Sequence, residues 1–342
     1  MQNFFQFPAN TGPTRRIVRE LQKRLIAEGF LTDDVVESGY FCRQTGDALI
    51  AFQTQQGLPP DGSCDQYTWA ALVEAAWNLG SRLLYFTSPQ LRGNDVAVLQ
   101  DLLAKLGFDC GRIDGILGPK SIRALIDFQT NFGLAPDGIC GPETLRALDR
   151  VIGHGGDGPG IVTVREYEEL LRGDFFGASA SPRIVIATMR NQSPQLIQIA
   201  QQISRELHDK SEQVIIIDHA DVNDHIRTAN AFEAHVYLGI DYAIADENVV
   251  AYYETPTFVS QGGRSLAQEV VAQLSETRDN VARVVGMRLP VLRETRMPAV
   301  ICTFDKTPMF EDDQKTYAHA LANAVSTWVS RISEGSPPAS SD

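Results

Sequence analysis

The second half of the chain alternates short apolar runs with segments whose apolar residues recur at helical spacing. Arg183–Thr188 reads RIVIAT, and the apolar positions of the following LIQIAQQISREL fall on one helical face. A second apolar run, Gln213–Asp221, precedes the amphipathic DHIRTANAF, and His235–Tyr242 supplies a third strand. This order predicts an α/β domain with a mostly parallel sheet flanked by helices.

The first half of the chain contains two copies of one pattern. VRELQKRLIAEGF at 18–30 returns as VAVLQDLLAKLGF at 96–108, and ALIAFQTQQGLPPDGSC at 48–64 returns as ALIDFQTNFGLAPDGIC at 124–140. Each copy has Leu and Phe at helical spacing and a Pro-Asp-Gly turn before its last helix. The chain therefore begins with two small all-α modules of three helices each.

Turn and linker composition completes the predicted domain organisation. Gly and Pro are dense in GHGGDGPG, which is typical of a linker, and Ser and Pro dominate the last residues, which favours disorder. The predicted parts are a first repeat at 14–76, a second repeat at 91–152, a Gly-rich linker with a short helix at 153–180, the α/β domain at 181–333 and a disordered tail at 334–342.

The two repeats resemble peptidoglycan-binding domain type 1. The second copy matches better, with IDGILGPKSIRALIDFQ and DGICGPETLRAL, whereas LTDDVVESGY lengthens a loop of the first. Asp114 and Asp137 lie in turns of the second copy, where their carboxylates could bind a sugar or peptide, and turn geometry is the competing explanation. The aromatic residues of the connection, Trp77, Tyr85 and Phe86, are expected to hold the repeats together rather than stack on sugars.

The α/β half resembles the N-acetylmuramoyl-L-alanine amidase family of zinc enzymes. Arg227, Ala229 and Asn230 match the R...AN element of that family, and residues 292–300 contain its LR...PAV element. On this frame, the resemblance places other residues where the family keeps its metal ligands and catalytic acid. Arg190 and Asp241 stand for the two histidines, Gln192 for the metal-binding Glu and Thr303 for the catalytic Glu.

These four residues do not supply the chemistry of a zinc hydrolase. Such a site needs three protein ligands and a bound water, and a nearby carboxylate that takes the proton of that water. Asp241 is the one metal ligand among the four, and Arg190 is a permanent cation that repels zinc. The resemblance therefore implies a degenerate amidase with no catalytic residue, no bound metal and no cofactor.

Two alternatives stay open. GHGGDGPG contains His154 and reads like the metal loop of the family, so an amidase with relocated ligands such as His154 and Asp241 is one of them. The linker interpretation is preferred because a buried strand first appears later, at Arg183–Thr188. The other is a binding module, in which Arg190 pairs with a phosphate or carboxylate of a peptidoglycan precursor.

Composition narrows the classes of partner. The formal net charge of −13 disfavours nucleic acids and anionic membrane surfaces. No transmembrane segment and no export signal are evident, so a cytoplasmic location is expected, with recruitment to the inner membrane face through partners. Five cysteines without CxxC spacing favour reduced thiols over disulfides or a zinc site.

The whole arrangement, from about residue 14 to 332, resembles a family of actinobacterial degenerate amidases, with AAWNLGSRLLY, NDVAVLQ and DGICGPETLRAL as the matching stretches. That resemblance implies a non-hydrolytic regulator of cell-wall synthesis. Its expected partners are the cytoplasmic UDP-GlcNAc enolpyruvyl transferase and a Ser/Thr kinase or its phospho-reader. The tail contains no threonine, so its candidate phosphosites are Ser336, Ser340 and Ser341.

Overall fold

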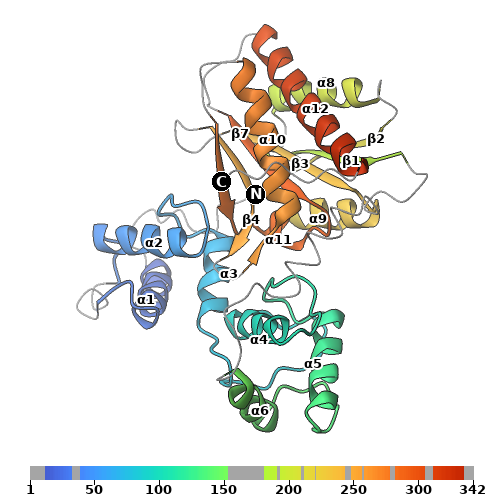
Figure 1. The fold of residues 1–342 in the computed structure, drawn as a ribbon. Coiled ribbons are helices and arrows are strands. Elements are labelled where there is room, and N and C mark those ends of the chain that lie inside the picture. Colours follow the sequence, from blue (N-terminus) through green and yellow to red (C-terminus); the bar gives the residue numbers. More distant parts are fainter. Residues whose placement is uncertain are drawn as a thin grey trace. The chain divides into compact units, whose positions relative to one another are not determined.

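The computed structural model (Figure 1) describes residues 12–32, 39–152, 181–190, 193–208, 212–219, 221–242, 248–255, 258–277, 282–304 and 311–334. The chain forms two compact units, Met1–Val164 and Arg165–Asp342. The predicted linker and residues 335–342 of the predicted tail lie outside the described residues. Within the described part, no helix is long and apolar enough to cross a membrane.

The first unit is built from two three-helix repeats. The helices are α1 (Gly12–Ala27), α2 (Arg43–Gln55), α3 (Gln66–Ala75), α4 (Asn94–Lys105), α5 (Pro119–Asn131) and α6 (Pro142–Ile152). Both cores use the same positions: Leu21, Leu25, Leu49, Phe52 and Leu72 of the first repeat correspond to Leu99, Leu103, Leu125, Phe128 and Leu148 of the second, and all ten are buried. The two copies thus share their core packing as well as their sequence pattern.

Buried glutamines fix the turns of both repeats. Gln129 is 1% exposed, and its Nε2 donates to Asp137 Oδ1 at 2.8 Å and to the Ile139 carbonyl at 3.0 Å, while its Oε1 accepts the Gly138 amide at 2.9 Å. Gln53 makes the same contacts to the turn at residues 61–63. A buried amide that satisfies both sides of a turn holds it against the helix, because an unpaired group there would be costly.

The connection between the repeats packs onto the second repeat. Leu84 pairs with Cys140 in an antiparallel bridge, and Arg82 makes a 2.7 Å ion pair with the buried Asp95 while stacking 4.2 Å from the Trp77 ring. Tyr85 and Phe86 are 46% and 53% exposed. Their neighbours Arg82 and Leu84 anchor the segment, and the expectation that the two rings hold the repeats together stays a prediction.

The second unit is a mixed sheet with helices on both faces, which confirms the predicted α/β class (Figure 1). Its strands are β1 (Arg183–Thr188), β2 (Gln213–Asp218), β3 (Val236–Tyr242), β4 (Val249–Thr255), β5 (Phe258–Val259), β6 (Arg283–Met287) and β7 (Ala299–Phe304). The order is β2-β1-β3-β7-β4-β5, with β6 beside β4. The β1, β2, β3 and β7 strands are mutually parallel, whereas β4 runs antiparallel to β7.

Helices cover this sheet unequally. The helices of the second unit are α8 (Pro194–His208), α9 (Val222–Ala231), α10 (Gln261–Thr277), α11 (Pro290–Glu294) and α12 (Glu311–Ser333). Val236, Leu238 and Ile240 of β3 face the main core with Leu196 of α8 and Trp328 of α12. Side chains alternate along a strand, so Tyr237 faces the opposite side, where it meets α9.

Candidate functional site at the carboxyl edge of the sheet

Three parallel strands bring the degenerate positions to one edge of the sheet. Thr188 at the end of β1 is in register with Ile240 of β3, and Asp241 is in register with Thr303 of β7. Arg190 follows β1 by two residues, so it lies at the same edge. Ligands of open α/β sheets bind at such carboxyl ends. Gln192 lies outside the described residues, so its place in this group stays a prediction.

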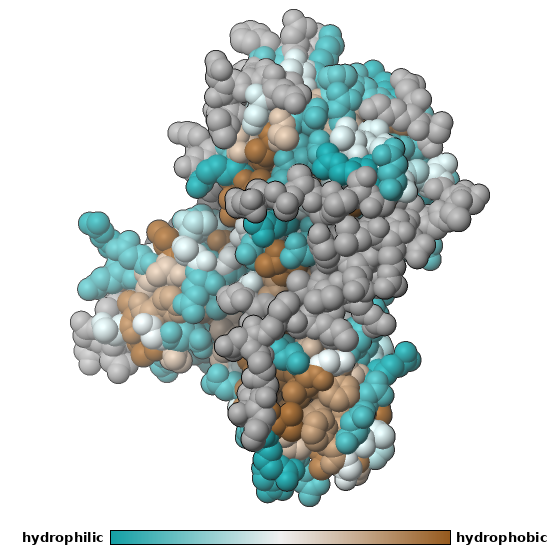
Figure 2. Space-filling view, in the orientation of Figure 1, coloured by the Kyte–Doolittle hydropathy of each residue, from teal (hydrophilic) through white to brown (hydrophobic). Residues whose placement is uncertain are grey.

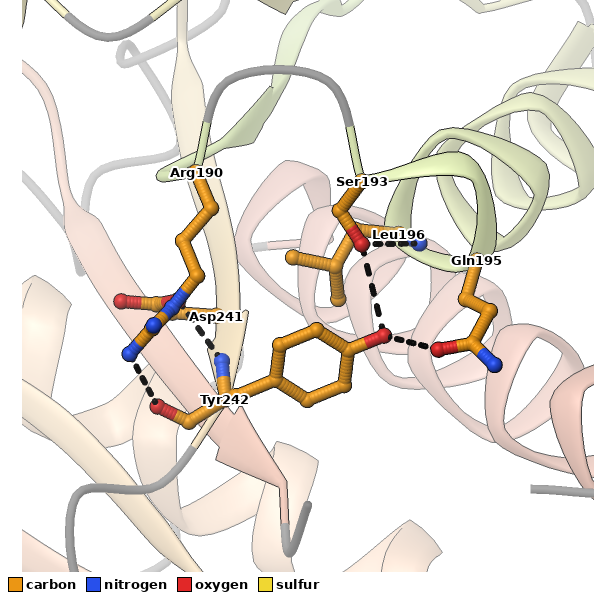
Figure 3. A network of polar contacts seen from close by, with 6 residues as sticks. All are labelled: Arg190, Ser193, Gln195, Leu196, Asp241 and Tyr242. Carbon is orange, nitrogen blue, oxygen red and sulfur yellow. Dashed lines mark hydrogen bonds and ion pairs between the residues drawn. The ribbon is translucent and has the colours of Figure 1, made fainter. Parts of the chain in front are cut away.

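Arg190 and Asp241 form an ion pair at this edge (Figure 3). Arg190 Nε donates to Asp241 Oδ1 at 2.5 Å, and its Nη2 donates to the Tyr242 carbonyl at 3.4 Å. The same Asp241 oxygen accepts the Tyr242 amide at 2.7 Å. The two side chains remain 43% and 24% exposed. The one carboxylate of the group is thereby committed to a guanidinium and a backbone amide.

Tyr242 extends this network to the start of α8 (Figure 3). Its hydroxyl donates to Gln195 Oε1 at 2.5 Å and receives a 3.4 Å hydrogen bond from Ser193 Oγ. Ser193 also accepts the Leu196 amide at 3.5 Å, which satisfies one of the free amides in the first turn of the helix. The polar loop after β1 is thus tied to β3 by side-chain contacts.

Thr303 is occupied in a different way. Its Oγ1 donates to the Val249 carbonyl at 3.1 Å and accepts the Val249 amide at 3.2 Å. A threonine hydroxyl cannot take a proton at neutral pH as a carboxylate does. This hydroxyl instead closes the end of the β4–β7 pair, so it holds the scaffold together.

The described residues at this edge do not form a zinc site. Among the described residues, no group of three or more His, Cys, Asp or Glu side chains is arranged to hold a metal. The chemistry of the donor set agrees, because the guanidinium of Arg190 lies against the carboxylate that a cation would need. His154, the centre of the relocated-ligand alternative, lies outside the described residues.

A buried His–Tyr pair lies under the same edge and was missed by the sequence analysis. His225 of α9 is 1% exposed, and its Nδ1 lies 2.8 Å from the Tyr237 hydroxyl while its Nε2 lies 2.6 Å from the His219 carbonyl oxygen. Burial lowers the pKa of His225. The i, i+4 spacing of His225 and Ala229 could have revealed it, because both fall on the buried face of one helix.

Asp114 and Asp137 hold turns together in the second repeat. Asp137 Oδ1 accepts the Ile139 amide at 2.9 Å as well as Gln129 Nε2, and the hydrogen bond from Ile139 is the main reason why the pKa of Asp137 is lowered. Asp114 Oδ1 accepts the Ile116 amide and Gln100 Nε2 in the same way. These contacts favour the turn explanation over ligand binding. Ser336, Ser340 and Ser341 lie outside the described residues.

Comparison with known proteins identifies the repeats. Residues 14–72 and 92–148 each match the family described as a putative peptidoglycan binding domain. The chain is 39% identical over 136 residues to the N-acetylmuramoyl-L-alanine amidase CwlM of Mycobacterium tuberculosis, a match that covers 37% of this chain and 33% of that protein. It is 33% identical over 140 residues to the amidase CwlL of Bacillus licheniformis, covering 35% of this chain and 39% of the relative.

The chain thus spans about a third of the length of the curated relatives that it matches. Among solved structures, the amidase AmiC2 of Nostoc punctiforme aligns with a TM-score of 0.37 and 17% identity, over 45% of this chain and all of the other. The amidase Ami1 of Mycobacterium abscessus aligns with a TM-score of 0.36 and 10% identity, over 44% of this chain and all of the other. The chain thus carries two repeats that match the putative peptidoglycan binding domain family, and part of it is similar in sequence to N-acetylmuramoyl-L-alanine amidases.

Proposed function

We propose that this protein is a non-catalytic regulator of peptidoglycan precursor synthesis, in which the amidase-like unit serves as a protein-binding scaffold. The observation that carries the proposal is the Arg190–Asp241 ion pair at the carboxyl edge of the sheet. A zinc amidase needs a cation at that edge and anionic or neutral ligands around it. Here the protein supplies its own cation and uses its carboxylate to hold it.

Thr303 supports the same conclusion. In the mechanism that the family resemblance implies, a carboxylate takes the proton of the zinc-bound water. The Thr303 hydroxyl bonds the backbone of Val249 instead. The contacts of Asp241 and Thr303 with other parts of the fold therefore support a non-catalytic role.

The proposed partner is the cytoplasmic UDP-GlcNAc enolpyruvyl transferase, which the protein binds and stimulates. This step rests on the resemblance to degenerate actinobacterial amidases and on the 39% identity to CwlM over 136 residues. Phosphorylation of Ser336, Ser340 or Ser341 by a Ser/Thr kinase is the proposed control. A phosphate adds nearly two negative charges and strong acceptors, which a phospho-reader or an Arg cluster of the transferase would recognise.

Reconstitution tests this function directly. The purified transferase is assayed alone, with this protein, and with this protein after treatment with a Ser/Thr kinase. We expect the phosphorylated protein to raise the rate of phosphate release from phosphoenolpyruvate. A triple Ser336→Ala, Ser340→Ala, Ser341→Ala variant is the matched control and should not respond to the kinase. An unchanged rate in every arm, with no complex on a sizing column, would reject the proposed partner.

A second candidate function, recognition of a muropeptide or a nucleotide-linked precursor, is favoured by one observation. Tyr85 and Phe86 are exposed beside the Leu84–Cys140 bridge of the second repeat, where a sugar could stack on them. Titration calorimetry with a soluble muropeptide separates the candidates. Heat that disappears in a Tyr85→Ala, Phe86→Ala variant supports binding through the repeat, and heat that disappears in Arg190→Ala supports binding at the sheet edge.

A further inference from the structure

Helix α1 presents a stripe of exposed cations in an otherwise acidic protein. Arg16, Arg19 and Lys23 are all exposed. Their spacing, i, i+3 and i+7, places them on one face of the helix over about 10 Å. The opposite face carries Val18 and Leu21, which are buried in the first repeat. Three positive charges thus face solvent on a chain whose formal net charge is −13.

The neighbouring cations of α1 are already engaged. The guanidinium of Arg15 lies 4.5 Å from the centre of the Tyr40 ring. Arg24 pairs with Glu20 at 3.0 Å and lies 5.3 Å from the Trp69 ring. By contrast, none of the three stripe residues forms an ion pair with another described residue. The stripe residues are exposed to solvent, whereas the cations beside them support the fold of the repeat.

The second repeat shows that the fold does not require this stripe. Helix α4 occupies the equivalent place and packs the same leucines, yet Arg16, Arg19 and Lys23 correspond there to Asn94, Ala97 and Asp101. Two copies of one module thus share a core and differ in the charge of one helix face. A charge that is dispensable for folding in one copy points to a role outside folding in the other.

The charge balance of the chain selects the class of partner. A nucleic acid or an anionic membrane would bring many negative charges against a protein with net charge −13, and three cations are fewer than lipid-binding clusters usually carry. A short acidic helix brings only a few carboxylates, so it meets less repulsion, and these can repeat once per turn opposite the stripe. We propose that Arg16, Arg19 and Lys23 form a docking site for an acidic helical segment of a partner protein.

Substitution by the residues of the second repeat gives a matched test. The full chain is titrated with a labelled helical peptide that carries Glu at i, i+3, i+7 and i+10, at low and at physiological salt. The Arg16→Asn, Arg19→Ala, Lys23→Asp variant should bind on the order of tenfold more weakly, since each exposed ion pair contributes little alone. A peptide with Gln in place of Glu should not bind the wild-type chain. Circular dichroism melting checks that the variant remains folded.

A reciprocal variant tests the proposal by a gain of peptide binding instead of a loss. Asn94→Arg, Ala97→Arg and Asp101→Lys, introduced into the triple variant, move the stripe to α4 and should restore peptide binding. An unchanged affinity in the triple variant would overturn the proposal. So would stripe-dependent binding that is tighter to phosphatidylglycerol vesicles or to a 20-nucleotide single-stranded DNA than to the acidic peptide. Either failure would leave the proposed function of the amidase-like unit intact.

Discussion

At the scale of single residues, buried polar groups rather than charges define the repeats. Gln53, Gln100 and Gln129 are almost fully buried, and each donates to a turn and accepts from it. Gln22 is the equivalent of Gln100 and donates to the Tyr40 carbonyl, but among the described residues its Oε1 has no hydrogen-bond partner. The repeat with the longer loop thus has a glutamine that makes the donor hydrogen bonds of this set but not the acceptor one.

The first prediction follows from this difference. Gln129→Leu leaves the buried Gly138 amide without a partner and removes the donor to Asp137 and to the Ile139 carbonyl, so it should lower the free energy of unfolding by about 2–3 kcal/mol. Gln22→Leu removes only donor contacts and should cost about 1 kcal/mol. Urea unfolding of the two variants measures both values. Equal losses of unfolding free energy would show that the hydrogen bond accepted by Gln129 Oε1 does not contribute to stability.

Thiol reactivity is the second prediction at this scale. Burial raises the pKa of Cys64, Cys110 and Cys140 to about 12, and it raises that of Cys302 further. Cys42 differs: partial burial raises its pKa, but hydrogen bonds from Thr45 and nearby backbone amides outweigh it, and the net pKa is lowered. Because the thiolate is the reactive form, one thiol of five should react rapidly with a disulfide reagent at pH 8. Cys42→Ser should abolish that phase, and a surviving fast phase would contradict the assignment.

At the scale of elements, apolar periodicity in the sequence predicted some of the strands. Other strands became evident only from their pairing in the sheet. The strands at β1, β2 and β3 were expected because each is a continuous apolar run. The strands β4 and β6 were not expected, although VVAYYET and RVVGM are largely apolar. They pair with each other, and β4 also pairs with β7, so their place in the sheet depends on tertiary pairing. The ion pair between Arg190 and Asp241 depends on the register of β1 with β3, which no sequence spacing gives.

The third prediction concerns the pH dependence of the second unit. Burial lowers the pKa of both His225 and His235 from the ordinary value of 6.5, against the attraction of Asp218 and Asp221 for the former and of Glu233 for the latter. The unfolded chain therefore binds protons more readily. Stability should be full above about pH 6.5 and should fall as the pH drops below it, by at most about 1.4 kcal/mol per pH unit for each histidine.

Trp328 is buried in α12. In a Trp69→Phe, Trp77→Phe background it is the one remaining tryptophan, so its fluorescence reports the unfolding of the second unit. Urea unfolding is measured at pH 7.5 and pH 5.5, above the range in which carboxylates titrate. A His225→Gln variant should lose part of the pH dependence, because glutamine can bond to Tyr237 without taking a proton. A variant with the full wild-type dependence would show that other groups are responsible.

At the scale of the whole molecule, the chain combines two repeats that match peptidoglycan-binding domains with an α/β unit in which Arg190 and Asp241 form an ion pair. Internal repetition and the apolar pattern of the sequence predicted the repeats and the α/β class. The hydrogen bonds of Asp114, Asp137 and Thr303 then indicated that these side chains hold turns and strands in place. The charged face of α1 stood out only when the two repeats were compared in structure, since burial decides which cations are free to act.

The central claim is that the edge of the sheet holds an ion pair in place of a metal. The measurement that tests it most directly is zinc content by mass spectrometry of protein purified without chelators, beside a muramoyl-alanine hydrolysis assay. We predict less than 0.1 zinc per chain, as an order-of-magnitude limit, and no product. About one zinc per chain would contradict the account. If an Asp241→Ala, His154→Ala variant then lost the metal, the ligands would be the relocated ones.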